Sequence, residues 1–506
     1  MSEKTDRKEE EAPAEDLKKT DQDISREEKL LKLAEAGIDL FPRRVERTHS
    51  VFEVVRDFAA WKPEELEEKK IAVVVPGRIL SIRKMGRATF ATISDSRAKV
   101  QIYLRQDSVG SKAYELWSLL DIGDLVSVGG SLFKTRTGEL TVHVRSWTFL
   151  AKCLHPLPEK WHGLQDVELR YRRRYLDLIM SPEVGDVFRL RSRMIAEIRR
   201  FFDDRGYIEV ETPMMQPIPG GALARPFKTF HNALGIDLYL RIAPELYLKR
   251  LIVGGMEKVY EINRNFRNEG ISAEHNPEFT MLEFYEAYSD YHDMMSLTEE
   301  LLHTLSLTLL DAEEFPYGEE RISFRRPFAR LKYREAIVRL SGLAPGRFEN
   351  RQDMMAFASG LAGESRPLSY AKAQDVIFDK LVKPRIVQPT FITNMPKEIS
   401  PLAKASSENP EETDRFELIV AGMEIANAFS ELSDPQEQRR RFEQQAEEKK
   451  KGVEESHWID LDYVQALEYG LPPTGGEGIG IDRLTMLLAN RRSIREVILF
   501  PLLRPK

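Results

Sequence analysis

The sequence predicts an α+β protein in which a small β-barrel precedes a larger domain of helices and antiparallel strands. Residues 70–150 contain about five short runs rich in valine and isoleucine, separated by glycine turns, which is typical of a compact barrel. Residues 258–286 read as strand, loop and strand, with the alternating polarity of half-buried β-strands. The sequence contains neither a P-loop nor a βαβ unit with GxGxxG, so a parallel nucleotide-binding fold is disfavoured.

The composition indicates a large folded protein in a reducing compartment. The chain has 506 residues, of which 42% are hydrophobic, and a formal net charge of −7. Its single cysteine, Cys153, excludes an internal disulfide and a cysteine-based zinc cluster. No apolar run is long enough to span a membrane, and the N-terminus lacks the apolar segment of a signal peptide. We therefore expect a cytoplasmic protein whose nucleic-acid contacts come from local basic patches.

The chain is expected to divide into five segments. Residues 1–25 mix acidic residues and lysine with almost no apolar residues, which predicts a disordered charged tail, with a frayed helix as the alternative. Residues 169–179 form a basic amphipathic stretch that fits either a hinge helix facing phosphates or an ordinary solvated face. After the tail, the expected segments are an N-terminal helical segment at 26–69, a barrel at 70–152, a linker or hinge at 153–180, and a large domain at 181–506 with a mainly helical insertion at about 312–410.

An OB-type barrel is the natural expectation for residues 70–152, although part of a β-sandwich would share the pattern. Three of its side chains would suit single-stranded nucleic acid. Phe90 could stack on a base, Gln101 could read a base edge, and Arg78 could contact a base or the backbone. This signal is weak by itself, because a phenylalanine in a strand is usually part of a core.

The hairpin at residues 258–286 carries the strongest indication of a binding site. Its alternation predicts that Tyr260, Leu282 and Phe284 face a core, while the opposite face is polar or mixed. A site that must hold an anion, a flat ring and an ammonium group together requires such a face, whereas a charged hairpin beside solvent, the alternative, does not. The residues expected at its mouth are Arg267, Glu269, His275, Asn276, Phe279, Glu283 and Tyr285.

The other elements of the large domain follow from periodicity and turn residues. Apolar residues at steps of four, four and three predict an amphipathic helix over residues 188–204, which stops at Gly206. Strands are predicted at residues 207–210 and 238–242, and Glu245 begins the helix that follows the second of them.

Glycines mark two places where a ligand can approach the backbone closely. Gly220 and Gly221 lie in a loop, and a glycine alternation at residues 476–480 precedes a helix that begins near Arg483. The alternation alone would also fit a close-packed strand end. A strand pair is predicted over residues 415–432, and one face of its second half carries Asn427, Phe429 and Glu431.

Five segments, occurring together and in this order, resemble the class II aminoacyl-tRNA synthetases and, within them, the lysyl-tRNA synthetase family. They are ETPMMQPIPGGALARPF, RIAPELYLKRL, FRNEGISAEHNPEFTMLEFYEAY, EIANAFSEL and GEGIGIDRL. The resemblance runs from about residue 70 to the C-terminus. It implies an OB-type anticodon-binding domain, a catalytic antiparallel sheet with flanking helices, and a homodimer built partly on the helix of the first class motif.

The resemblance also implies the activity of that family. L-lysine and ATP would give lysyl-adenylate and pyrophosphate, and the lysyl group would then pass to the 3′-terminal adenosine hydroxyl of tRNA(Lys). The first step is a displacement at phosphorus, in which positioning and charge neutralisation matter more than acid–base chemistry. The expected partners are therefore ATP, L-lysine, tRNA(Lys) and a second copy of the chain, with no membrane.

By the same resemblance, Arg267 and Arg483 would be the catalytic residues. Arg267 would clamp the lysine carboxylate and the α-phosphate, and Arg483 would cover the γ-phosphate and stack on the adenine against Phe279. Glu417 and Glu424 would bind Mg²⁺ alongside phosphate oxygens. The implied ATP-binding residues are Arg267, Glu269, His275, Asn276, Phe279, Glu424 and Arg483.

The implied lysine site contains carboxylates for both ammonium groups of the substrate. Glu245 would meet the α-ammonium, helped by the backbone near Gly220, and Glu431 would receive the ε-ammonium. The other implied lysine-binding residues are Glu283, Tyr285, Asn427 and Phe429. The implied anticodon contacts are Arg78, Phe90, Gln101 and Glu139, with Phe90 stacking on a uridine-rich triplet.

Three rival interpretations share parts of this pattern. Aspartyl- and asparaginyl-tRNA synthetases have the same two-domain plan, but their pockets must hold a carboxylate or an amide, which Glu431 disfavours. A protein-lysylating relative would lack the barrel that residues 70–150 predict. A catalytically inactive paralogue would be free to lose Arg267, Glu424 and Arg483, and all three are present.

Overall fold

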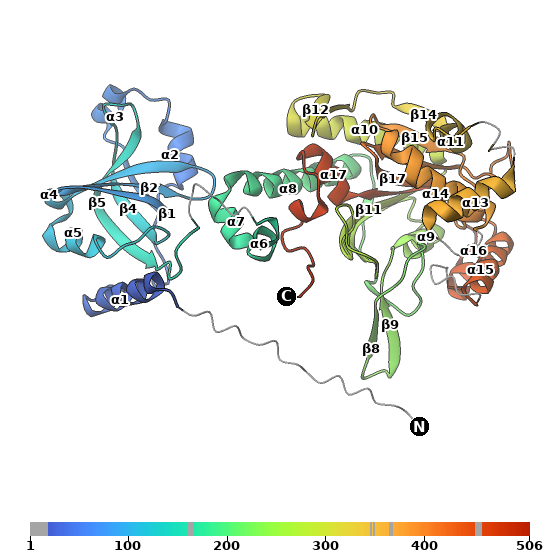
Figure 1. Cartoon of the computed structure of the whole chain (residues 1–506), viewed down its shortest axis with the longest axis horizontal. Coiled ribbons are helices and arrows are strands. Elements are labelled where there is room, and N and C mark those ends of the chain that lie inside the picture. The colour runs from blue at the N-terminus through green and yellow to red at the C-terminus, as the bar shows by residue number, and fades with distance from the viewer. Residues whose placement is uncertain are drawn as a thin grey trace. The chain divides into compact units, whose positions relative to one another are not determined.

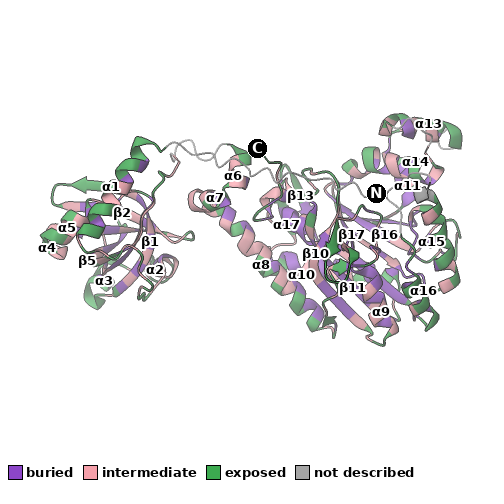
Figure 2. Ribbon diagram, turned by 90° about the horizontal axis from the view of Figure 1, so that it is seen from below, coloured by how far each residue is buried: buried purple, intermediate pink, exposed green. Residues whose placement is uncertain are grey.

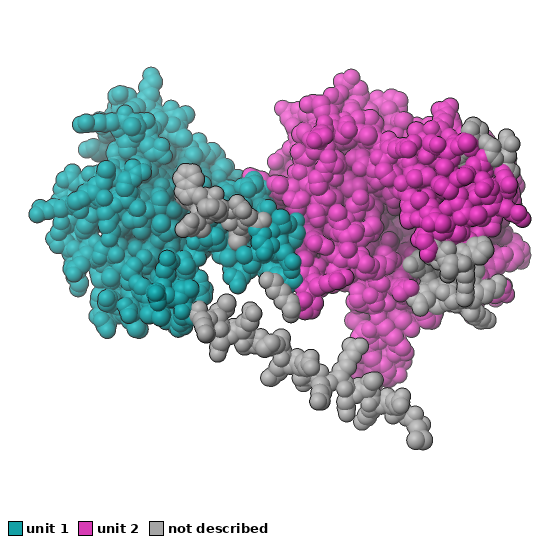
Figure 3. All heavy atoms as spheres, viewed as in Figure 1, with its two compact units in different colours: residues 1–185 teal, residues 186–506 magenta. Residues whose placement is uncertain are grey.

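The computed structural model describes residues 19–158, 166–344, 347, 350–363, 368–450 and 458–505. The chain forms two compact units, residues 1–185 and residues 186–506 (Figures 1 and 3). The predicted end of the linker at residue 180 therefore lies close to the boundary between the units. Each unit has its own hydrophobic core.

Unit 1 is built on a closed five-stranded barrel with the strand order β1-β2-β3-β5-β4. All neighbouring pairs are antiparallel except β3 and β5. Alternate side chains such as Val75, Ile93, Ile102 and Val128 are fully buried inside it. The closed barrel confirms the predicted OB-type domain and excludes the sandwich alternative. Its strands are β1 (Ala72–Met85), β2 (Ala88–Ser94), β3 (Lys99–Arg105), β4 (Leu125–Lys134) and β5 (Leu140–Ala151).

The first helix begins earlier than the sequence suggested. Helix α1 (Asp21–Glu35) starts five residues before the expected boundary, because Thr20 and Asp23 form a capping box. The Thr20 hydroxyl accepts a hydrogen bond from the Asp23 amide at 3.2 Å, and the Asp23 carboxylate accepts one from the Thr20 amide at 2.8 Å. The predicted disordered tail is therefore wrong for residues 21–25, and its residues 1–18 lie outside the described part.

The remaining helices of unit 1 surround the barrel and continue into the predicted linker. Arg26 on α1 donates hydrogen bonds to the backbone oxygen of Ile122, which fastens that helix to the barrel domain. The helices are α2 (Val51–Phe58), α3 (Pro63–Lys69), α4 (Gln106–Val109), α5 (Ser111–Trp117), α6 (Val167–Arg172) and α7 (Arg174–Met180). The last two lie in the predicted linker, so the basic stretch at residues 169–179 is helical.

Unit 2 is organised around one eight-stranded sheet with the order β14-β15-β16-β17-β18-β11-β10-β6. Only the outermost pairs, β14 with β15 and β6 with β10, are parallel, which confirms the predicted antiparallel sheet. The strands are β6 (Ile208–Glu209), β10 (Lys258–Phe266), β11 (Glu278–Ala287), β14 (Ala329–Lys332), β15 (Thr390–Thr393), β16 (Arg415–Val420), β17 (Met423–Ser430) and β18 (Thr474–Gly480).

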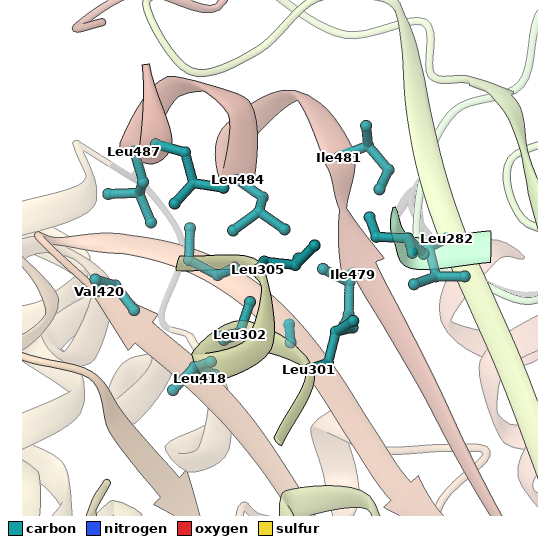
Figure 4. Packing of buried hydrophobic residues seen from close by; sticks show 14 of the residues in the cluster. Leu282, Leu301, Leu302, Leu305, Leu418, Val420, Ile479, Ile481, Leu484 and Leu487 are labelled. Carbon is teal, nitrogen blue, oxygen red and sulfur yellow. The ribbon is translucent and has the colours of Figure 1, made fainter. Parts of the chain in front are cut away.

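One face of this sheet is covered by helices and forms the main core of unit 2. Helices α8 (Pro182–Asp203), α10 (Tyr291–Leu310) and α17 (Ile481–Leu488) contribute to it. Figure 4 shows Leu301, Leu302 and Leu305 of α10 between the strand residues Leu418 and Ile479 and the helix α17. The strands themselves are largely buried (Figure 2). Because helices seal this face, a polar ligand could reach the strands only from the other face.

The opposite face is covered only at one end. There α9 (Glu245–Val253) and α16 (Leu461–Glu468) pack on the sheet through a smaller apolar cluster, and α15 (Pro435–Lys450) lies against α16. A separate three-stranded sheet, in the order β7-β9-β8, follows α8 in the chain. It is formed by β7 (Met215–Gln216), β8 (Lys228–His231) and β9 (Ile236–Leu240), and the β8–β9 hairpin projects from the body of unit 2 (Figure 1).

The predicted element boundaries in this region were close but not identical. Helix α8 begins six residues before the predicted start at residue 188, and β9 ends two residues before the predicted end at residue 242. The strand predicted at residues 207–210 shortens to the two residues of β6.

The mainly helical insertion predicted at about 312–410 needs a correction. Its two four-residue strands β14 and β15 belong to the large sheet, and β12 (Glu314–Tyr317) and β13 (Glu320–Ser323) form a hairpin. Such short strands carry too few residues to show a period of two, so the sequence pattern could not reveal β14. The described helices of this segment, which do form a core of their own, are α11 (Tyr333–Leu340), α13 (Arg351–Ala362), α14 (Tyr370–Ile377) and the short η1 (Phe378–Val382), η2 (Lys383–Arg385) and η3 (Lys397–Ile399).

Within the described ranges, none of the helices has both the length and the apolar character that crossing a bilayer requires.

One acidic side chain lies inside the main core of unit 2. Glu477 on β18 pairs across the sheet with the fully buried Phe284 and Ala428, and it is 2% exposed. Its carboxyl oxygens lie 2.6 and 2.7 Å from the Thr298 hydroxyl, which also donates a hydrogen bond to the Met294 backbone oxygen. Burial raises the pKa of Glu477 to about 8. The carboxyl is therefore protonated at neutral pH and can donate its proton to the Thr298 oxygen.

We expect Glu477→Gln to become more stable than the wild type as the pH rises. The folded-state pKa lies above the unfolded value, so the carboxyl costs no stability below about pH 4.5, and its cost grows up to about pH 8. At pH 8.5 the variant should be more stable by about 2–5 kcal/mol, and at pH 5 the two should be close to equal. Urea unfolding at both pH values measures this, with Glu443→Gln as an exposed control. Equal pH dependence in all three proteins would contradict the assignment.

Candidate active site

A cavity of about 380 Å³ lies on the uncovered part of the sheet in unit 2. Its lining comes from four neighbouring strands (β16, β17, β18 and β11), from the loop between β10 and β11, and from the start of α9. In the described part of the chain it combines buried acidic groups with three arginines, Arg267, Arg415 and Arg483, so it meets the requirement for a site that holds both an ammonium group and an anion.

The strand register brings the site residues together. Residues that pair across antiparallel strands point to the same face of a sheet. One row of paired residues therefore runs across the cavity floor through Glu417, Asn427, Gly478 and Glu283, and it continues to Glu261 on β10. The next row contains Arg415, Phe429, Gly476 and Tyr285. This confirms the predicted faces of the hairpin and of the second half of residues 415–432.

The glycines of β18 are required by this geometry. A Cβ atom at residue 476 would overlap Oε1 of Glu431 and the ring of Tyr285. At residue 478 a Cβ would lie 2.9 Å from the terminal methyl of Met281, and at residue 220 it would lie 2.6 Å from Cδ1 of Leu246. Gly476 is thus closely packed against Glu431 and Tyr285, as the close-packed alternative expected, whereas a Cβ at residue 480 would have no neighbour closer than 3.8 Å.

Glu424 reaches the cavity through a β-bulge. Leu418 pairs with Ala426 but the next residue, Ile419, pairs with Glu424, so Ile425 is extra. Ile425 turns into the main core, and Glu424 consequently lines the cavity on the same side as Asn427. A simple alternation from Asn427 would have placed Glu424 on the wrong face.

Three carboxylates meet at the closed end of the cavity. Glu245, Glu283 and Glu431 are 6%, 6% and 2% exposed. Burial, followed by the charge of Glu245, raises the pKa of Glu283 to about 8. The Tyr285 hydroxyl donates a hydrogen bond to Oε2 of Glu283 at 3.3 Å. The predicted lysine-site acids are therefore close neighbours.

Two predicted residues do not line the open cavity. Glu431 lies against the side-chain face of Gly476, beside the ring of Tyr285, and neither Glu431 nor Gly220 belongs to the cavity lining. Glu431 instead contacts the ammonium group of Lys249, which also lies 2.6 Å from Oε1 of Glu245. Sequence reasoning missed Lys249. The available signal was its position four residues after Glu245 on one helix, a spacing that places two side chains on the same face.

The open end of the cavity carries the two predicted arginines. Arg267 lies with its guanidinium carbon 5.0 Å from the centre of the Phe279 ring, and burial lowers its pKa. Arg483 donates a hydrogen bond to the Glu424 backbone oxygen at 2.8 Å and lies 3.1 Å from Nε2 of His275. Burial and the Arg483 charge lower the pKa of His275, so its ring is neutral at pH 7.

Two buried polar atoms at this end have no protein partner among the described residues. They are Nε of Arg267, one of the two catalytic residues implied by the resemblance, and Oδ1 of Asn276. Asn276 uses its amide nitrogen to donate to the Glu278 backbone oxygen at 2.6 Å, and Glu269 lines the cavity beside it. Buried groups of this kind are normally satisfied, so they mark the place of a polar ligand.

Glu417, which is buried, and Glu424, whose side chain is partly exposed, lie on the cavity wall. Burial and the charge of Glu424 raise the pKa of Glu417 to about 8, although Arg415 lies 2.7 Å from its Oε1 atom. Burial opposes ionisation of Glu424 too, but Lys383 and Arg483 hold its pKa below the usual value. The described residues contain no cluster of three or more acidic, histidine or cysteine side chains suited to a metal ion. Two carboxylates with phosphate oxygens beside them fit the ligand preference of Mg²⁺.

The outer face of the barrel in unit 1 carries the predicted nucleic-acid residues. Phe90 stacks on Tyr103 with ring centres 4.5 Å apart, and Oε1 of Gln101 accepts a hydrogen bond from Thr141 at 3.0 Å. Arg78 pairs with Ser94 on the same face of β2 and donates to the Gly123 backbone oxygen at 2.7 Å. Glu139 is exposed at the turn before β5.

The aromatic surface around Phe90 is larger than the sequence suggested. Tyr103 lies 6.1 Å from Phe133 and 5.7 Å from His143, measured between ring centres. Tyr103 follows Gln101 by two residues on β3, so the same alternation that pointed to Gln101 could have found it. Phe133 and His143 come from β4 and β5, and only the closure of the barrel brings them to this face.

Comparison with known proteins supports both units. A family model described as tRNA synthetases class II (D, K and N) matches residues 166–504, and one described as an OB-fold nucleic acid binding domain matches residues 73–150. A protein of Pelotomaculum thermopropionicum named lysine–tRNA ligase is 54% identical over 484 residues, which cover 95% of this chain and 94% of that protein. Proteins with the same name from Syntrophomonas wolfei and Carboxydothermus hydrogenoformans are 53% and 52% identical, each over 95% of this chain and 96% or 97% of their own length.

Proposed function

The chain belongs to the class II tRNA synthetases (D, K and N), and on this premise we propose that it is a lysine–tRNA ligase. It activates L-lysine with ATP, releasing pyrophosphate, and transfers the lysyl group from the adenylate to the 3′-terminal adenosine hydroxyl of tRNA(Lys). The observation that carries this proposal is the polarity of the cavity, with three carboxylates at its closed end and two arginines at its open end. Free lysine has the matching arrangement of charges. It carries an α-ammonium group, a carboxylate beside it, and an ε-ammonium group at the end of the side chain.

The closed end accounts for the choice of amino acid. Glu245 receives the α-ammonium, and Glu431 with Glu283 and Tyr285 receives the ε-ammonium after the side chain passes over Gly476. Asn427 and Phe429 line the path between them. A recessed carboxylate discriminates strongly against a neutral side chain of the same shape. With such a substrate the carboxylate would be buried without a substrate ammonium group as its partner.

The open end accounts for the first chemical step. The Arg267 guanidinium donates to the lysine carboxylate and to the α-phosphate, which brings nucleophile and electrophile together and neutralises the charge that develops. Phe279 and Arg483 hold the adenine between them, while Glu269 accepts from its amino group. His275 and Asn276 lie beside the path of the triphosphate. No general base is needed, because the lysine carboxylate is already ionised.

Magnesium fits the carboxylate pair at the cavity wall. Glu417 and Glu424 would hold the ion, and when bound it would neutralise the charge on the phosphates. Burial and the neighbouring charge of Glu424 raise the pKa of Glu417, and a divalent cation held by these carboxylates would favour the ionised form of both.

Rival specificities are disfavoured by the charges of the closed end. An aspartate or asparagine substrate requires a free cation or a neutral donor in that place. The cation that the structure has there, Lys249, is already in contact with Glu245 and Glu431. A purely protein-lysylating function would not need the anticodon-type barrel of unit 1.

We expect ATP–pyrophosphate exchange that depends on lysine and not on arginine, ornithine or aspartate, and that stops when a chelator removes Mg²⁺. In Glu431→Gln the lysine KM should rise by about 30-fold or more, because one member of a buried charge pair is lost. Glu257→Gln, an exposed acid in the loop before β10, is the control and should leave KM unchanged. Exchange driven by aspartate would replace the proposal with the first rival, and no exchange with any amino acid would indicate an inactive paralogue.

Unit 1 would bind the anticodon of tRNA(Lys). Phe90 offers a stacking platform, which Tyr103 extends, and Gln101 and Arg78 present polar groups on the same face. Glu139 lies at the rim, where an acceptor for base amino groups would be accessible.

In Phe90→Ala the KM for tRNA in lysylation should rise by about 5- to 100-fold, which is the usual contribution of one stacked base. Lysine-dependent pyrophosphate exchange should stay at the wild-type rate, because the lysine and ATP contacts lie in unit 2. Phe41→Ala, another phenylalanine of unit 1 that is 79% exposed, is the matched control. Equal loss of exchange and lysylation in Phe90→Ala would argue against an anticodon role.

We further propose a homodimer, with the reaction taking place in the cytoplasm. Exposed apolar side chains gather on β6, β7 and the β8–β9 hairpin, and a partner would remove them from water. They are Ile208, Met215, Phe230, Leu234 and Ile236, each between 42% and 66% exposed. Sedimentation velocity should give the mass of two chains at micromolar concentration, and a single chain would refute the dimer. Cell fractionation checks the compartment.

A further inference from the structure

Lys249 is a fully buried cation whose charge is matched by two of the proposed lysine-binding acids. Its side chain is 0% exposed, its ammonium lies 2.6 Å from Oε1 of Glu245, and it contacts the carboxylate of Glu431. The ammonium also lies 5.3 Å from the centre of the Phe429 ring. It therefore bridges the acid proposed for the α-ammonium and the acid proposed for the ε-ammonium, from behind the cavity.

The groups around Lys249 come from several elements and are mostly acidic. The carboxylates of Glu245, Glu283 and Glu431 contribute three potential negative charges within one closed space. Tyr463 on α16 places its ring centre 6.0 Å from the ammonium. The more distant cations have acid partners of their own, since Arg241 lies 2.6 Å from Glu261. The titratable and charged groups that face the Lys249 ammonium or its two acids are Glu245, Glu283, Tyr285, Arg415, Glu431 and Tyr463.

The closed end contains more acidic groups than cations. Glu245 and Glu431 share the ammonium group of Lys249, and Glu283, whose pKa burial raises to about 8, adds a third carboxyl group. Burial raises the pKa of Glu245 and of Glu431, and Lys249 is the strongest influence that opposes the rise in both. Without that cation both acids would tend to be protonated, and a protonated carboxyl cannot balance an ammonium group.

We propose that Lys249 is a positioning and specificity-determining residue that fixes the carboxylates of Glu245 and Glu431 in place and favours their ionised form, so that together they accept the two ammonium groups of lysine. This rests on the proposed function, because it concerns how the same cavity recognises its amino acid. Lys249 stays in place when lysine binds, and it makes no contact with the reacting carboxylate or with ATP. Its effect is confined to the amino-acid end of the cavity.

The test replaces Lys249 by methionine, which keeps the length of the side chain and removes its charge. In Lys249→Met we expect the lysine KM at pH 7 to rise by about 30-fold or more, while the ATP KM stays within about threefold. The rising limb of kcat/KM against pH should move to higher pH by about one unit or more, because the acids must first lose protons. Discrimination between lysine and its neutral analogue 6-hydroxynorleucine should shrink, since a protonated carboxyl can still bind a hydroxyl.

Lys258→Met is the matched control. The Lys258 ammonium also lies 2.6 Å from a glutamate, Glu286, and 5.3 Å from an aromatic ring, that of Tyr207, but it is outside the cavity. Its removal should leave the lysine KM and the pH profile unchanged. If losing any lysine–glutamate pair were enough to change the lysine KM, both variants would show the change. A change in Lys249→Met alone would indicate a role in recognition.

A double-mutant cycle distinguishes recognition from mere support of the fold. At pH 7, Glu431→Gln should cost much less in the Lys249→Met background than in the wild type, because Glu431 is already neutral there. Simple addition of the two effects would overturn the proposal. The double variant removes Lys249 together with one of its two acids, so it leaves only Glu245 without a cation and should be more stable than Lys249→Met, which leaves both acids.

The outcomes distinguish a failure of the proposed function from a failure of the proposed role of Lys249. If the wild type fails to exchange with lysine, the proposed function fails. If the wild type exchanges with lysine but Lys249→Met keeps the wild-type lysine KM and pH profile, the proposed function stands and the role of Lys249 is refuted.

Discussion

Strand β18 imposes the constraint on which the catalytic unit depends. It lies in the middle of the sheet, between β17 and β11, and its two faces serve opposite purposes. On one face Ile479 and Glu477 enter the core beneath α10 and α17. On the other face Gly476, Gly478 and Gly480 have no side chains. Side chains from the neighbouring strands can therefore lie over the backbone of β18. A β-carbon at Gly476 alone would overlap both Glu431 and Tyr285, and the closed end of the cavity could not form.

The second organising feature is the separation of charge along the cavity. Acids gather at the end where the sheet is covered by α9 and α16, and arginines gather where the β10–β11 loop leaves it open. Burying a charged group costs free energy unless the group has a partner of opposite charge. In this cavity some of the charged groups have such a partner and others do not. Lys249 balances part of the acidic end and Arg415 lies beside Glu417, whereas the Nε atom of Arg267 has no protein partner among the described residues. Specificity and chemistry thus arise from one arrangement of incomplete charge pairs.

Sequence reasoning succeeded where a period of two was uninterrupted and failed where the backbone departed from it. The faces of β10 and β11 were predicted correctly because nine consecutive pairs keep one register. The face of Glu424 could not be derived from spacing, because the bulge at Ile425 shifts the alternation by one residue. The strand β14 was not predicted because it is too short to show an alternation. The role of Lys249 was not predicted because a lysine on a helix is usually solvated. The capping box at Thr20 was visible in the sequence and was overlooked.

The sequence by itself determined the local structure and the residue types of the site: a five-stranded barrel, an alternating hairpin, a glycine strand, and a set of acids and arginines suited to an amino acid and a nucleotide. Alternation and turn chemistry are local properties, so they can be observed in a few consecutive residues. Only the tertiary structure decided which of these residues meet. Pairing of β11 with β18 joins segments about 190 residues apart, β17 pairs with β18 across about 50 residues, and the contact of Lys249 with Glu431 depends on both pairings. Such contacts depend on the packing of distant segments, which no local pattern encodes.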